Sequence, residues 1–194
     1  MIASSVGSGA GVLLWVAVGS ALEAMQIGGQ TTLVQALQGA VAGVMFGASF
    51  GVGQWLVLRP HMERAGRWVL ATAVGYAVVF LLGSTLIPGG EAVELGPATQ
   101  IAFGAVLGAA VAIPPGLLQW LLVLRRQLPG AGWWIPASAV SWAVGFAISF
   151  ALRLWLGELT FIAGPAVAIG LTGFALLRLL QGSGPVQSSQ SNRT

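Results

Sequence analysis

The sequence predicts an all-α integral membrane protein, a six-helix bundle that contains an internally duplicated transmembrane hairpin. Three observations lead to this class. Hydrophobic residues make up 56% of the 194 residues and charged residues only 7%, whereas a soluble domain carries roughly 25% charged residues. The apolar residues form blocks long enough to cross a bilayer, which takes about 20 residues per helix. A glycine-striped segment that follows Gln35 recurs after Gln100.

The apolar blocks divide the chain into six predicted spans. We place these spans at about 9–25, 32–58, 68–87, 97–124, 133–156 and 161–180. The first block follows no basic segment, which favours a retained helix over a cleaved signal peptide. Residues 1–181 are therefore predicted to form one transmembrane domain. The Ser-, Gln- and Gly-rich segment 182–194 is predicted to be a disordered C-terminal tail.

The arginines predict how the spans are oriented. Seven of the eight arginines fall in the links 59–67 and 125–132, at the end of the sixth span or in the tail, and only Arg153 falls on the other side. Cytoplasmic loops of membrane proteins collect Arg and Lys. Six spans with both termini in the cytoplasm follow, and we expect the membrane to be a bacterial inner (plasma) membrane.

Glycines spaced four residues apart mark the second and fourth spans as a glycine zipper. Residues four apart share one helix face, and small residues there let two helices pack closely. Tight helix packing is the favoured interpretation, and a groove for a flat or long apolar ligand, such as a lipid tail or a pigment, is the alternative. The glycines are Gly39, Gly43, Gly47 and Gly51 in the second span and Gly104, Gly108 and Gly116 in the fourth.

The glycine-striped spans begin two similar hairpins, at about 32–87 and 97–156. In each hairpin the stripe leads to Gln-Trp, a basic turn and a Trp-led helix, and the second turn is one residue longer. Because two spans separate the copies, they have the same orientation and form a parallel repeat. Weak similarities at 18–21 and 174–178 suggest a third hairpin, split between the two ends of the chain.

The pairs Gln54-Trp55 and Gln119-Trp120 follow the last glycine of each stripe. Trp followed by Arg is typical of an anchor at the membrane–water interface, and this interpretation is favoured. In the alternative interpretation, the Gln amides converge on a polar ligand. The adjacent Pro114 and Pro115 predict a kink that accommodates a neighbouring helix, which is the favoured interpretation. The alternative is a broken helix that exposes backbone groups to a substrate.

The remaining polar residues offer little chemistry. Glu23, Arg153 and Glu158 each lie near a helix end, where their side chains can reach the membrane–water interface, and this interpretation is favoured. In the alternative interpretation, Arg153 forms a buried pair with Glu158 or Glu23 in a substrate or proton pathway. The chain has one histidine, His61, and no Cys, Lys or Asp. These residues form no metal site, catalytic triad or phosphate loop. We therefore expect no enzyme activity, no cofactor and no nucleic-acid partner.

The repeated segment also carries a resemblance. The runs Gly-Val-Gly-Gln-Trp-Leu-Val-Leu-Arg at 51–59 and Gly-Leu-Leu-Gln-Trp-Leu-Leu-Val-Leu-Arg at 116–125 resemble repeated Gly-x-x-Gln-Trp-x-x-Leu-Arg hairpins. Such hairpins occur in uncharacterised bacterial multi-spanning membrane proteins of the cyanobacterial and filamentous-phototroph type. The resemblance covers the central four spans and implies a helical membrane fold without implying any chemistry. The second copy departs from the pattern by one inserted residue and by its two prolines.

Two functions remain open at this point. The first is a packing or accessory subunit in the lipid bilayer, which forms a homo-oligomer or joins a larger membrane complex. It rests on the glycine stripes and the lack of buried charge. The alternative is a transporter or binding component for a small solute or a lipid-like ligand. It rests on Gln54, Gln119, Pro114 and Pro115, together with the parallel repeat.

Overall fold

Every regular element that the structure describes is a helix. The computed structural model describes residues 32–86, 96–128, 130–157 and 160–182. The elements, in order, are α2 (Thr32–Leu58), α3 (Gly66–Leu86), α4 (Pro97–Gln119), the π-helical turn η1 (Trp120–Leu124), α5 (Arg125–Gln127), the 3-10 turn η2 (Ala131–Trp133), α6 (Trp134–Leu156) and α7 (Thr160–Gly182). The all-α class is confirmed for these residues, whereas the predicted span 9–25 and the tail after residue 182 lie outside them.

Four of the described helical segments are long and apolar enough to cross a membrane. They are Leu33–Leu58, Gly66–Leu86, Pro97–Gln127 and Ala131–Arg153, and the apolar part of α7, Ala163–Leu179, is shorter. Large apolar side chains face outward on several helices; Val106 is 70% exposed and Val140 is 62% exposed. Such a surface suits lipid and would be unfavourable in water, so the chain is a membrane protein.

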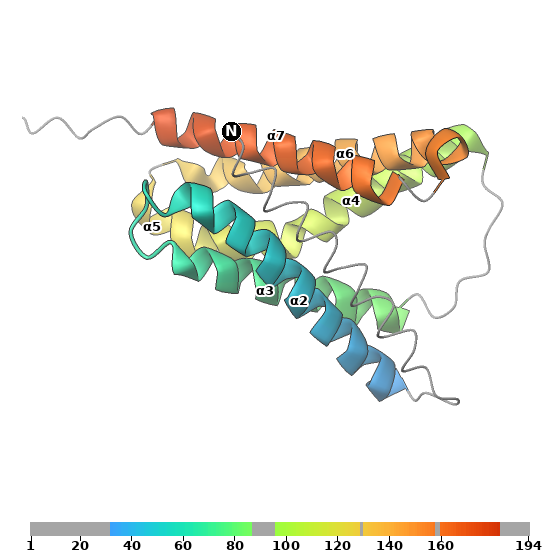
Figure 1. Cartoon of the computed structure of the whole chain (residues 1–194), viewed down its shortest axis with the longest axis horizontal. Coiled ribbons are helices and arrows are strands. Elements are labelled where there is room, and N and C mark those ends of the chain that lie inside the picture. The colour runs from blue at the N-terminus through green and yellow to red at the C-terminus, as the bar shows by residue number, and fades with distance from the viewer. Residues whose placement is uncertain (1–31, 87–95, 129, 158–159, 183–194) are drawn as a thin grey trace, which may run out of the picture.

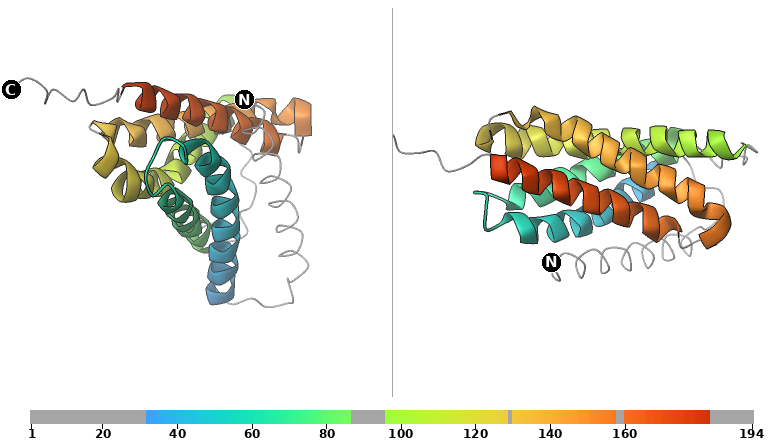
Figure 2. Two further views of the ribbon diagram at one scale, coloured as in Figure 1. Left: turned by 60° about the vertical axis from the view of Figure 1, so that its left-hand side comes forward. Right: turned by 90° about the horizontal axis from the view of Figure 1, so that it is seen from above.

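The long helices that the structure describes form two antiparallel pairs and one further helix (Figure 1). α2 packs along α3, and α4 packs along α6. α3 and α4 bring the two pairs together, and α7 lies along α6. Both views in Figure 2 show the α2–α3 pair crossing the layer formed by α4, α6 and α7. The α2–α3 turn, α5 and the C-terminal end of α7 all lie at one end of the bundle, which we call the turn end.

The interior of the bundle has two apolar clusters. The turn-end core joins both hairpin turns to α7 and consists of Leu58, Met62, Ala65, Trp68, Val123, Leu124, Leu128, Ala131, Trp134, Leu176 and Leu179. An aromatic core lies farther along the bundle, where Tyr76 and Trp142 are buried among Phe46, Phe50, Phe80 and Phe146. The centroids of the Tyr76 and Trp142 rings are 5.9 Å apart, and the interplanar angle is 61°. This geometry is the edge-to-face arrangement that aromatic rings prefer.

The two turns have closely similar backbones. The Met62 amide donates to the carbonyl oxygen of Leu58 at 3.0 Å, and the Leu128 amide donates to that of Leu124 at 2.9 Å. Each turn also contains one described residue with positive φ, Arg64 in the first turn and Gly130 in the second. The residues that form the two amide–carbonyl bonds all belong to the turn-end core. Both turns are therefore packed into the bundle instead of forming free loops.

Candidate functional site

The glycines of α2 face α3, the other helix of their own hairpin. A Cβ atom at Gly47 would lie 2.6 Å from the carbonyl oxygen of Thr72, and one at Gly51 would lie 3.0 Å from the Cα of Val69. A Cβ at Gly43 would collide with the carbonyl oxygen of Tyr76. Because these neighbours are backbone atoms, they cannot rotate away as side chains can. The stripe is thus filled by a helix of the same chain.

The glycines of α4 face α6 in the same way. A Cβ atom at Gly104 would lie 2.5 Å from the Phe150 ring, and one at Gly108 would collide with the carbonyl oxygen of Trp142. Gly116 packs more loosely, because its Cβ would meet Ser138 at 3.5 Å, an ordinary van der Waals distance. Neither stripe is open to a lipid tail, a pigment or a second protein chain.

Gln54 and Gln119 each accept a hydrogen bond from a tryptophan that begins the next long helix. Trp68 Nε1 donates to Gln54 Oε1 at 2.7 Å, and Trp134 Nε1 donates to Gln119 Oε1 at 2.9 Å. Both indole rings are at least 99% buried. A buried indole N–H needs an acceptor, and an apolar segment supplies few acceptors apart from such an amide. Each Gln therefore ties the stripe helix to the following helix at the turn end.

Gln119 also joins the two hairpins. Its Nε2 donates to Thr72 Oγ1 of α3 at 2.9 Å, and Thr72 Oγ1 donates to the carbonyl oxygen of Trp68 at 2.7 Å. The Trp68 and Trp134 rings meet edge to face, with their centroids 5.5 Å apart. We call these five residues, Gln54, Gln119, Trp68, Trp134 and Thr72, the glutamine–tryptophan layer. It contains Thr72 and Gln119, two of the buried polar residues of the described interior.

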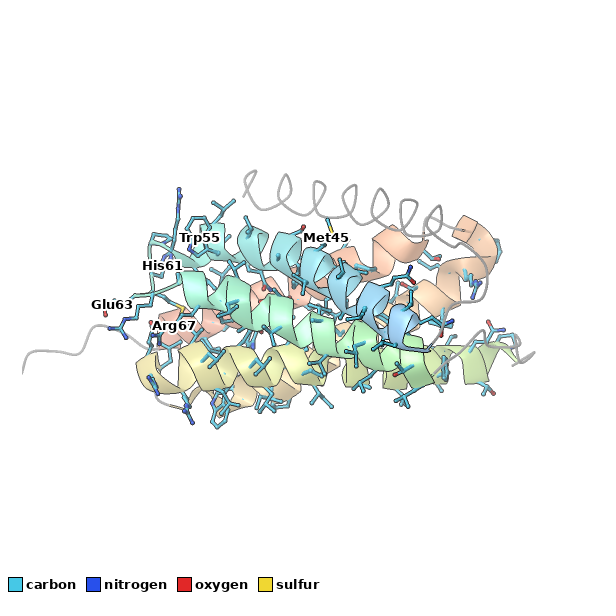
Figure 3. All side chains as sticks on the ribbon, turned by 90° about the horizontal axis from the view of Figure 1, so that it is seen from below. Met45, Trp55, His61, Glu63 and Arg67 are labelled. Carbon is cyan, nitrogen blue, oxygen red and sulfur yellow. The ribbon has the colours of Figure 1, made fainter. Side chains whose placement is uncertain are left out.

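Trp55 and Trp120 lie outside this layer, although each follows one of its glutamines. Both side chains are partly buried against the turn-end core. The Arg59 guanidinium lies over the Trp55 ring, 5.6 Å from its centroid. Figure 3 shows Trp55 near the turn end, close to the labelled residues of the first turn. A Trp with an adjacent Arg at a helix end has the geometry of an interfacial anchor.

Pro114 and Pro115 do not interrupt α4, which is one helix from Pro97 to Gln119. Pro115 is buried, and its backbone lies directly against Gly75 of α3, where a Cβ atom would collide with it. Pro114 is half-buried. The glycine thus accommodates the proline at the place where the two hairpins meet.

Arg153 lies at the far end of the bundle from the other described arginines, in the last turn of α6. Its side chain is exposed, and its carbonyl oxygen accepts the Gly157 amide. Its predicted partners, Glu23 and Glu158, lie outside the described residues. Arg153 therefore lies at the opposite end of the bundle from Gln54, Trp55, Gln119 and Trp120.

The layer can stabilise and orient helices, and its buried polar groups already have partners. Within the described part of the chain, no buried side-chain nitrogen or oxygen lacks a hydrogen-bond partner. The same residues contain no group of three side chains that could hold a metal ion. Sequence reasoning identified the two glutamines and missed Thr72, Trp68 and Trp134. The sequence feature that could have revealed these bonds is the Trp that follows each turn, since a Trp buried in an apolar helix requires a hydrogen-bond acceptor nearby.

In comparisons with known proteins, the chain matches no family model, no curated protein and no solved structure.

Proposed function

We propose that this chain is a non-enzymatic accessory subunit of the membrane, which associates with itself or joins a larger membrane complex. The observation that supports this most directly is the engagement of Gln119. This amide is 3% exposed, and its oxygen and nitrogen both bond to side chains of the same chain, Trp134 and Thr72. A glutamine used in this way serves the architecture of the bundle.

The alternative, a transporter or ligand-binding component, loses most of its candidate groups in this geometry. Gln54 and Gln119 both accept indole N–H groups, and α4 continues through its prolines. The glycine stripes are covered by α3 and α6. A ligand would have to displace these internal contacts, and each displaced contact would lower the affinity for the ligand.

Membrane topology and the repeat are part of the same proposal. Six spans, with both termini in the cytoplasm of a bacterial inner membrane, are supported by the gathering of six described arginines at the turn end. A duplicated hairpin is supported by the paired bonds Trp68–Gln54 and Trp134–Gln119. Further support comes from the paired amide–carbonyl bonds of the two turns.

Purification of the full chain in a mild detergent tests the proposed role. Native mass spectrometry would then report the protein partners and the bound small molecules together. We expect a homo-oligomer or a complex with another membrane protein, and the same assembly after Gln54→Ala. A monomer that carries one stoichiometric small molecule, and loses it in both Gln54→Ala and Gln119→Ala while remaining folded, would overturn the proposal in favour of the ligand-binding alternative.

A further inference from the structure

The turn end carries a strong and unbalanced positive charge. Six of the described arginines lie there, all with exposed side chains: Arg59, Arg64, Arg67, Arg125, Arg126 and Arg178. Glu63 is the one acidic residue described at this end. Among the described residues, none of these arginines forms an ion pair with a carboxylate. The arginine side chains are exposed, so this charge lies at the surface of the described part of the chain.

The arginines are held on a rigid base. The Gln127 side-chain amide donates to the carbonyl oxygen of Glu63 at 2.8 Å and so ties the second turn to the first. Met62 and Ala65 of the first turn, with Leu128 and Ala131 of the second, are buried in the turn-end core. Because the backbone of the turns is already packed, binding a ligand here would cost little further backbone entropy. Figure 3 shows the labelled side chains of the first turn projecting from this end.

Arg64 occupies a backbone conformation that disfavours it. Its φ is 55°, and it is the one described residue other than glycine with positive φ. The corresponding residue of the second turn is Gly130, with φ 75°. Glycine adopts this left-handed region freely, whereas the Cβ of any other L-residue crowds the following carbonyl oxygen. Glycine would thus be less strained at position 64, where the chain carries an arginine with an exposed side chain.

Two aromatic contacts favour a position for this charge at the depth of lipid headgroups. Arg59 lies over the Trp55 ring, and Arg178 lies over the Phe174 ring at 5.0 Å. Trp133, which ends the second turn, is 41% exposed. Aromatic side chains flanked by arginine are characteristic of the interface between hydrocarbon and headgroups. Basic groups at that depth attract anionic lipids, and each arginine near the surface raises the lipid affinity about fivefold.

We infer that the turn end is a binding surface for the phosphate headgroups of anionic phospholipids, with Arg64 as a direct ligand. Arg125 and Arg126 of the second turn and Arg59 and Arg67 of the first supply the surrounding charge. Neutral phospholipids carry the same phosphate with a compensating cation, so they should bind more weakly. The inference requires only that the chain spans a membrane, and it does not depend on the accessory role proposed above.

The test measures the thermal unfolding midpoint of the full chain in dodecyl maltoside by tryptophan fluorescence. Added phosphatidylglycerol or cardiolipin should raise the midpoint, whereas phosphatidylcholine and inorganic phosphate at equal concentration should not. The Arg64→Gly variant should unfold at the same or a higher temperature in detergent alone and should lose about half or more of the shift caused by phosphatidylglycerol. This pattern separates a ligand role for the arginine from a structural role.

Arg153→Gln is the matched control, because Arg153 is exposed at the opposite end of the bundle. It should retain the full phosphatidylglycerol shift. Equal shifts with phosphatidylglycerol and phosphatidylcholine, or a full shift in Arg64→Gly, would overturn the inference. So would an equal loss in Arg153→Gln, which would indicate a general charge effect. A shift reproduced by inorganic phosphate would show a free-anion site and would likewise overturn lipid binding.

Discussion

The backbone N–H of Arg125 donates to the carbonyl oxygen of Trp120, five residues earlier in the chain. The corresponding bond in the first hairpin joins Arg59 to Trp55, four residues apart, at 2.8 Å. The extra residue of the second hairpin is thus contained in the π-helical turn η1, since a π-helix places five residues where an α-helix places four. As a result, Leu58 and Leu124 are both fully buried in the turn-end core.

Alanine at Gly43 or Gly108 should destabilise the folded monomer. The new Cβ would collide with the carbonyl oxygen of Tyr76 or of Trp142, and forcing extra atoms into a packed interior costs about 1–3 kcal/mol. We expect a lower unfolding temperature for each variant. Gly170→Ala is the control, because nothing lies within 4 Å of a Cβ there. If Gly43→Ala changed only the oligomeric state and left the unfolding temperature unchanged, the internal packing of the stripe would be refuted.

Alanine at Gly75 should weaken the contact between the two hairpins. Its Cβ would collide with the backbone of Pro115, so α3 and α4 would have to move apart, at a cost of about 1–3 kcal/mol. Gly83→Ala in the same helix is the matched control, since a Cβ there meets nothing within 4 Å. Urea unfolding in detergent would measure both variants. Equal stability of the two would show that the approach of α3 to Pro115 contributes little.

Replacing Gln119 should cost more than replacing Gln54. Gln119→Leu leaves the fully buried Trp134 N–H without its acceptor and removes the bond to Thr72, and one buried unsatisfied donor costs about 1–3 kcal/mol. Gln54 is half-buried and accepts one hydrogen bond from Trp68, so Gln54→Leu should cost less.

Unfolding monitored by tryptophan fluorescence would rank these two glutamine variants. A double-mutant cycle with Thr72→Val would isolate the bond between Gln119 and Thr72, for which we expect a coupling of about 1 kcal/mol. Zero coupling would mean that the hairpins do not depend on this bond. If Gln54→Leu lowered the stability more than Gln119→Leu, the prediction that Gln119 contributes more would be wrong.

The sequence was sufficient to locate the described helices. α2 ends at the predicted residue 58, α4 begins at the predicted residue 97, and α6 ends at the predicted residue 156. The length of each apolar block and the polar residues of each turn determine where these helices begin and end. The bond between Gln119 and Thr72 could not be predicted, because Thr72 lies in the other hairpin. The distance between the two side chains depends on how α3 crosses α4. Similarly, the sequence shows that the second hairpin has one inserted residue. That this residue is accommodated by the π-helical turn η1 could not be predicted, because it depends on the burial of Leu124 in the turn-end core.

Deleting Leu122 should leave the fold nearly unchanged. Leu122 is 42% exposed within η1, and its loss would give Trp-Leu-Val-Leu-Arg, the sequence found at 55–59. The Arg125 amide could then form an α-helical bond to Trp120, and Leu124 would stay in the core. We expect a stability change below about 1 kcal/mol, comparable to that of a surface substitution, measured as the thermal midpoint in detergent.

The matched control is deletion of Leu56, which is 39% exposed in α2. α2 has no π-helical turn to absorb the change, so the deletion rotates Leu58 and the following turn by about 100° relative to the rest of the helix. Leu58 and Met62 would leave the turn-end core, and removing one such large apolar side chain from a core costs about 2–5 kcal/mol. Equal damage from both deletions would show that η1 is required by the fold and does not merely accommodate an extra residue.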